Sequence, residues 1–216
     1  MRGFFFNYKM TKITLSSLSE IELLSLMSAS AVLRKYKLLG MIFAVLKERN
    51  INLFKVYESL LQIYIFSGYP NALVAFKYAS KYFQFEKIKS EKIIFSDLSK
   101  RGKHTSQKIY GNNLARLVTN VKNLSPDLSE WFILEGYGKV LSRKNLSLKD
   151  RELQIIAMLT CLRYEDQLLS HIIGALRNGA TSLEVQKVIL NLRIFNSNRI
   201  VDFGIGILNR YLEKKG

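Results

Sequence analysis

Residues 145–185 decide the fold, and they read NLSLKDRELQIIAMLTCLRYEDQLLSHIIGALRNGATSLEV. Two apolar segments with helical spacing lie on either side of the polar run 163–166. Ser147 is followed three residues later by Asp150, which is typical of a helix start because a hydroxyl can cap the first turn and an acid faces the positive end of the helix dipole. The second apolar segment ends at Gly179, a usual helix stop. The stretch therefore predicts an antiparallel pair of helices that turns near residues 163–164.

Each predicted helix carries one residue that can exchange protons near neutral pH. Glu152 lies roughly 11 residues before the turn and His171 roughly 7 residues after it, so at about 1.5 Å per residue the hairpin can bring them towards one another. They form a candidate acid/base pair. Structural roles stay open for both, with Glu152 as a helix-start acid paired with a basic neighbour and His171 as a hydrogen-bonded core histidine.

A set of short motifs around this pair resembles the carboxymuconolactone decarboxylase family, within the wider group that includes alkylhydroperoxidase D. The motifs are Gly136-Tyr137-Gly138, Leu141-Ser142-Arg143, Leu146-Ser147-Leu148, Arg151-Glu152-Leu153, His171 and Gly174-Ala175-Leu176 through Gly179-Ala180-Thr181. The resemblance covers residues 111–195 and implies an all-α fold of the alkylhydroperoxidase D type. In the peroxidase branch a Cys-x-x-Cys pair lies between the glutamate and the histidine. Tyr164 and Gln167 occupy those positions here, so the redox pair is absent.

The resemblance implies cofactor-free decarboxylation of a small carboxylated lactone or keto acid. In that reaction Glu152 and His171 would move a proton to and from the carbon that loses carbon dioxide, and Arg143 or Arg151 would hold a substrate carboxylate. Further candidates for substrate contact are aromatic: Trp131, Tyr137 and Tyr164. As core packing, Trp131 and Tyr137 need no further explanation. A catalytically inactive scaffold or binding protein is the alternative hypothesis.

Composition favours an all-α protein with no metal or other cofactor. Of 216 residues, two are proline and twelve are glycine, against frequent leucine, isoleucine and lysine. The two histidines and one cysteine are dispersed and give no metal-ligand spacing, and His104 is expected at the surface. Cys161 lies in an apolar run, which argues against thiol peroxidase activity and for a buried side chain.

The single cysteine and the N-terminal residues favour a cytoplasmic location. Disulfides within the chain are excluded, and MRGFFFNYKM shows no apolar stretch of signal-peptide length. Met10 is an alternative start. The longest uncharged run, 59–76, is interrupted by Gly68 and Pro70, so a buried helix followed by a turn explains it better than a membrane span.

The formal net charge of +16 raises the question of an anionic partner. Basic surfaces attract nucleic acid and anionic lipid, but these lysines are scattered singly and form no dense block. A solvated basic face is the favoured interpretation. Nucleic acid or an anionic membrane surface stays as a less favoured partner.

The N-terminal part of the sequence also aligns with the C-terminal part. Shifts of 130 and then 129 residues pair these positions in order: Leu18 with Leu148, Glu22 with Glu152, Leu38 with Leu168, Ile42 with Ile172, Leu61 with Leu190 and Phe66 with Phe195. Met41 stands at the histidine position of the first copy. We therefore predict a lead-in at 1–14, a degenerate first helical repeat at 15–83, a polar connection at 84–110 and a second repeat at 111–212.

The predicted repeats should pack on each other, because a copy of about 65 residues cannot cover its own apolar faces. Four residues are expected near the pseudo-twofold axis: Leu38, Ile42, Leu168 and Ile172. Further assembly into a homo-oligomer is expected from the family resemblance. The lysines of residues 77–108 should face solvent, so that the contact between chains stays apolar.

Overall fold

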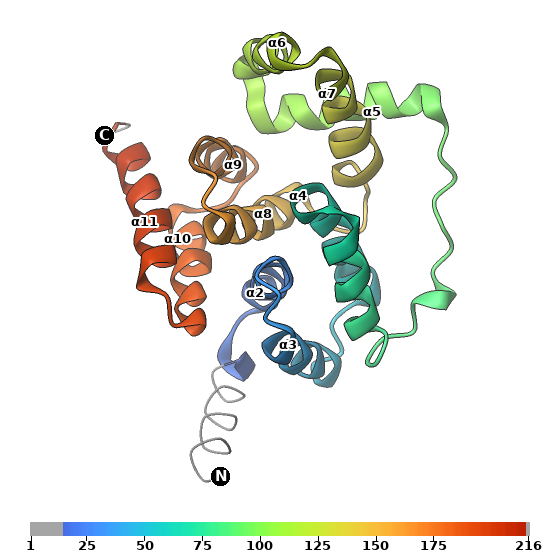
Figure 1. Cartoon of the computed structure of the whole chain (residues 1–216), viewed down its shortest axis with the longest axis vertical. Helices are drawn as coiled ribbons and strands as arrows, with labels where there is room; N and C mark the ends of the chain where they lie inside the picture. Colours follow the sequence, from blue (N-terminus) through green and yellow to red (C-terminus); the bar gives the residue numbers. More distant parts are fainter. Residues whose placement is uncertain (1–14, 215–216) are drawn as a thin grey trace.

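The computed structural model describes residues 15–214. Within that range the chain forms helices and no strand, which confirms the all-α prediction (Figure 1). The predicted lead-in and the alternative start at Met10 lie outside the described residues. No described helix is long and apolar enough to cross a membrane.

Two helices form the centre of the molecule, and each is buried on all sides. Helix α8 (Leu148–Leu162) begins at Ser147, whose hydroxyl accepts a hydrogen bond from the Asp150 backbone at 3.1 Å. All of residues 151–161 are buried. Helix α2 (Glu20–Val32) packs along α8 (Figure 1) and begins with a capping box, in which the Ser19 and Glu22 side chains each bond the other residue's backbone N–H. A helix buried all round belongs to the core.

The hairpin predicted from residues 145–185 is present. Helix α8 ends at Arg163, which has the left-handed backbone conformation with φ 61°, and α9 (Glu165–Arg177) returns along it. The second helix stops where the sequence indicated, because Gly179 has φ 93° and turns the chain. Thr181 then caps α10 (Ser182–Asn191).

The remaining helices flank this centre. They are α3 (Tyr36–Glu48) and α4 (Leu53–Ala79) before the connection, and η4 (Leu192–Phe195) and α11 (Asn198–Glu213) at the end of the chain. Helix α4 is kinked at Gly68, where φ is 76°, so the run 59–76 is a helix interrupted by a turn, as expected, but it is only partly buried, with Tyr69 and Leu73 60% and 65% exposed. The internal duplication stays a prediction.

The expected position of the contact between the two halves was wrong. The halves meet mainly along α2 and α8, while α3 and α9 lie on opposite sides of that pair (Figure 1). Ile42 and Ile172 are fully buried, but each packs within its own half. Helices α2 and α8 are buried on nearly all sides, whereas α3 and α9 each keep exposed residues, so α2 and α8 are the helices that form the contact.

Residues 84–141 form a further group of helices, most of which lie above the centre in Figure 1, while the short helix at 85–87 lies lower at one side. They are η1 (Phe85–Lys87), α5 (Phe95–Tyr110), η2 (Gly111–Asn113), α6 (Leu114–Leu124), α7 (Pro126–Trp131) and η3 (Phe132–Leu141), the last a π-helix. The connection expected at 84–110 is thus largely helical. Every lysine from 77 to 108 is exposed, as expected, and so is His104.

Helices α5 and η3 approach one another backbone to backbone. A Cβ added to Gly102 would overlap the carbonyl oxygen of Ile133, and one added to Gly138 would overlap that of Leu98. Glycine is therefore required at both positions. The close crossing fixes η3, which carries several residues of the site described below.

Candidate active site

Glu152 and His171 are in direct contact at the centre of the hairpin. Nδ1 of His171 lies 2.8 Å from Oε2 of Glu152. Glu152 is fully buried and His171 is 4% exposed. Paired with an ionised Glu152, which can only accept hydrogen bonds, His171 would donate this hydrogen bond from its Nδ1–H. This arrangement leaves Nε2 available to a ligand.

Gly174, one turn after His171 on α9, makes room for the carboxylate. A Cβ at this position would lie 2.5 Å from Oε2 of Glu152 and 2.8 Å from a methyl carbon of Ile109. Sequence analysis quoted Gly174 only as part of a motif. A glycine inside a predicted helix, where it costs up to about 1 kcal/mol against alanine, is the signal that could have indicated a close approach.

One oxygen of Glu152 is left without a partner. Within residues 15–214, buried Oε1 has no hydrogen bond. A buried polar atom of this kind costs about 1–3 kcal/mol of stability and is uncommon unless it has a function. The carboxylate is therefore held by its histidine and by packing alone.

His171 opens onto a cleft of about 460 Å³. Its lining comes from α4, α5, α6, α7, η3 and α9: Tyr64, Ile65, Phe66, Tyr110, Val121, Leu128, Trp131, Phe132, Glu135, Gly136, Tyr137, Leu141, Gln167 and His171. Two predicted substrate residues, Trp131 and Tyr137, are in this lining. Tyr164 is not among these residues, and its side chain lies 53% exposed before α9.

Two tyrosines and a phenylalanine hold the histidine from the cleft side. The hydroxyls of Tyr110 and Tyr137 share a 2.6 Å hydrogen bond. Burial raises the pKa of both phenols well above the usual value, so both remain neutral and polar. The rings of Tyr110 and Phe66 meet that of His171 edge to face, with centroids 6.2 Å and 5.9 Å away.

Sequence analysis missed Tyr110 and Phe66 as site residues. Tyr110 belongs to the predicted connection and Phe66 to the predicted first repeat. No local pattern indicates that either would contact a histidine far along the chain. Gln167, noted as the replacement for a redox cysteine, also lies in the cleft.

The two predicted carboxylate-binding arginines contact a protein carboxylate instead. Nε of Arg143 lies 2.8 Å and 3.0 Å from the two oxygens of Glu58, and Nη2 of Arg151 lies 2.8 Å from Oε2 of Glu58. Glu58 and Arg151 are fully buried. Burial lowers the pKa of Arg151 and Glu58 opposes that effect. Neither arginine lines the cleft, so a substrate carboxylate would have to compete with Glu58 for them.

Cys161 and the other potential metal ligands contribute no further site. Cys161 is buried in α8, and burial raises the pKa of its thiol to about 12. No group of three or more histidine, cysteine, aspartate or glutamate residues could hold a metal ion in the described part of the chain.

Residues 126–198 match the model of the carboxymuconolactone decarboxylase family. That span holds Glu152 and His171, the three aromatic candidates and both arginines. The all-α fold agrees with this match, which covers the C-terminal part of the chain and includes the contact of Glu152 with His171.

Two curated relatives match part of the chain. Peroxisomal protein 2 of Schizosaccharomyces pombe is 38% identical over 90 residues, which are 41% of this chain and 42% of the relative. A 4-carboxymuconolactone decarboxylase of Acinetobacter baylyi is 28% identical over 97 residues, 44% of this chain and 72% of the relative. The chain therefore spans less than half the length of the first relative.

Proposed function

We propose that the protein is a cofactor-independent decarboxylase of a small carboxylated lactone or keto acid. The observation that carries this proposal is the buried contact of Glu152 with His171, at 2.8 Å, on the wall of a cleft. A histidine held in one orientation by a carboxylate is an arrangement suited to general acid/base catalysis. The family match and the printed name of the bacterial relative supply the reaction class.

In the proposed reaction the bond between the substrate carbon and its carboxylate breaks. Carbon dioxide leaves, and the electron pair stays on the carbon, delocalised into the neighbouring carbonyl or lactone. In this step His171 acts as the imidazolium, protonated on both nitrogens: Nε2 delivers its proton to that carbon, and the neutral ring that remains keeps its Nδ1–H bonded to Glu152, which orients it. A proton from solvent restores the histidine. One proton is consumed and one carbon dioxide released, so the reaction needs no oxidant or reductant.

The cleft suits this chemistry because most of its wall is apolar. Phe66, Trp131 and Phe132 line it, and Glu135 is its one charged residue apart from the histidine. A substrate carboxylate bound next to His171 and away from Glu135 would lose its negative charge when it leaves as carbon dioxide. An apolar environment favours this loss of charge. Arg143 and Arg151 lie outside the lining of this cleft and contact Glu58, so they are not assigned to the substrate carboxylate.

The test is carbon dioxide release by the wild-type protein from 4-carboxymuconolactone and from a simple β-keto acid. His171→Gln should lower the rate by about 100-fold or more, the usual scale for loss of a general acid or base. His104→Gln is the matched control, because this second histidine is exposed on α5. Equal rates in wild type and His171→Gln would refute the assignment.

The alternative function is a non-catalytic scaffold or binding protein. One observation favours it, namely that Glu58 already engages both arginines predicted to hold the substrate. Folded wild-type protein without turnover of either substrate would support this alternative. Thiol peroxidase activity is not proposed, since Tyr164 and Gln167 replace the cysteine pair and Cys161 is buried.

A further inference from the structure

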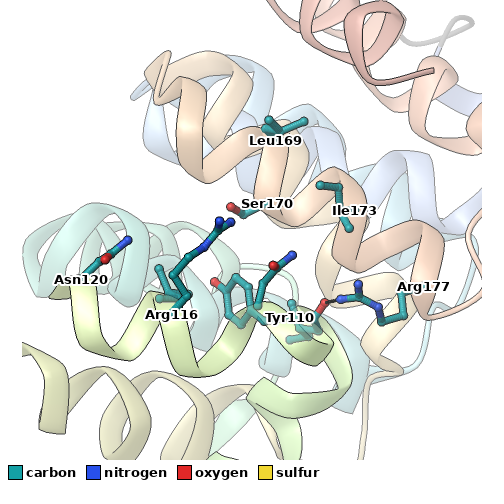
Figure 2. Close-up of a pocket in the computed structure, with 10 residues that line it drawn as sticks. Tyr110, Arg116, Asn120, Leu169, Ser170, Ile173 and Arg177 are labelled. Carbon is teal, nitrogen blue, oxygen red and sulfur yellow. Dashed lines mark hydrogen bonds between the residues drawn. The ribbon is translucent and has the colours of Figure 1, made fainter. Parts of the chain in front are cut away.

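A second pocket lies beside the cleft and has a different character. It has a volume of about 220 Å³ and lies between the end of α5, helix α6 and helix α9 (Figure 2). Tyr110 lines both the pocket and the cleft of His171, so the two are neighbours. Arg116 and Arg177 line the pocket and no acidic residue does. The pocket is therefore positively charged.

The side chain of Arg177 lines this pocket and is held in place by neighbouring groups of the protein. Its Nη1 donates a hydrogen bond to the carbonyl oxygen of Ile109, and the amide of Asn178 donates one to that of Lys108 at 3.1 Å. Gly111 has φ 55°, and a Cβ there would lie 3.0 Å from the central guanidinium carbon of Arg177. Part of the charge of Arg177 offsets the negative ends of α5 and α9, which both terminate here.

The guanidinium group of Arg116 is the one in this pocket that can bind a ligand. Figure 2 shows its side chain extending from α6 towards α9. Its guanidinium makes no ion pair with a carboxylate within residues 15–214, whereas Arg143 and Arg151 share Glu58. Asn113 and Asn120, also in the lining, supply amide donors. The hydroxyl of Ser170 is not free to donate, because it bonds the Asp166 carbonyl at 2.9 Å.

We infer that this pocket binds a small oxyanion, a carboxylate or phosphate group, through Arg116 with Arg177 as its fixed second wall. A guanidinium pairs with two oxygens of such a group at once, and the amides can donate to the remaining oxygens. A volume of about 220 Å³ suits a small ligand or one end of a larger one. The net charge of +16 adds long-range attraction for anions.

The experiment titrates the wild-type protein with phosphate and, separately, with malonate at constant ionic strength, with binding measured by calorimetry. Saturable binding of at least one anion is expected, and Arg116→Gln should weaken it by about tenfold or more, because a charged hydrogen-bonded pair is lost. Arg199→Gln is the control. It removes the same charge from an exposed arginine on α11, outside the pocket, and should change affinity by less than about twofold.

The two anions identify the ligand class. Binding of phosphate alone assigns a phosphate group, and binding of malonate alone or equally well assigns a carboxylate. No saturable binding of either up to about 10 mM overturns the inference. Equal weakening by Arg116→Gln and Arg199→Gln also overturns it, because the attraction would then come from net charge. His171→Gln should bind like wild type, so this result is independent of the proposed decarboxylation.

Discussion

Two glutamates, Glu58 and Glu152, are fully buried, and their partners distinguish their roles. Glu58 accepts hydrogen bonds from two arginines, which compensate the charge of its carboxylate. Glu152 has one titratable partner, His171, and one oxygen without a hydrogen bond in the described residues. A carboxylate satisfied by arginines contributes to structure. A carboxylate such as Glu152, whose titratable partner is a histidine beside a cleft, fits the proton transfer that we propose.

At the same scale, Cys161 is predicted to be inert in the folded protein. Burial raises the pKa of its thiol to about 12, so almost no thiolate is present at pH 8. Native protein should react with a thiol-specific disulfide reagent at least about 100-fold more slowly than the unfolded chain. Fast labelling of native protein, or hydroperoxide reduction that disappears in Cys161→Ser, would contradict this account.

Residue-level prediction from sequence succeeded where the contacts are local in the fold. The pairing of Glu152 with His171 followed from a 19-residue separation across a recognisable turn. The contact of Glu58 with the two arginines did not follow from the sequence, because Glu58 lies 85 residues from Arg143 and 93 residues from Arg151. No local sequence pattern encodes contacts at such separations. Tyr110 was missed for the same reason.

At the level of elements, the crossing of α5 and η3 positions much of the cleft. Gly102 and Gly138 allow the two backbones to touch. The π-helical η3 carries Phe132 and Tyr137, and π-helical segments frequently occur at functional sites. The sequence predicted only that this region is helical, as part of an all-α fold. It gave no signal for the π-helix, which depends on the tertiary contact with α5.

Gly138→Ala should lower the free energy of unfolding by about 1–3 kcal/mol, because the added methyl group overlaps the carbonyl oxygen of Leu98 and the helices must separate. Gly136→Ala is the control in the same helix. No atom outside the neighbouring helical backbone lies within 4 Å of its added Cβ, so this change should be neutral or stabilising by up to about 1 kcal/mol. Urea unfolding compares the two variants. Identical midpoints would show that the crossing does not need glycine at position 138.

At the level of the whole molecule, the helices above the centre leave apolar surface uncovered. Helix α6 has no buried residue although leucines and valines recur along one side, and Leu124 is 86% exposed. Leu128 and Trp131 on α7 are 54% and 55% exposed. Exposed apolar side chains grouped in this way are typical of an interaction surface.

We therefore expect a homo-oligomer, as the family resemblance also implied. Light scattering at moderate salt should give a mass of at least twice the chain mass of 24.9 kDa. Trp131→Glu, which adds charge to the exposed apolar area, should shift the equilibrium towards the single chain, and Gln84→Glu, at an exposed position before η1, serves as its control. A strict monomer at micromolar concentration would contradict the prediction. The cytoplasmic location and the duplication remain predictions.

The central claim is that Glu152 and His171 act as one unit in decarboxylation. Carbon dioxide release by wild type, Glu152→Gln, His171→Gln and the double variant tests it most directly, with folding of each checked by circular dichroism. If the pair is a unit, each single change lowers the rate by about 100-fold or more and the double change costs little beyond either single one. Single variants at wild-type rates, or two losses that multiply in the double variant, would contradict the account.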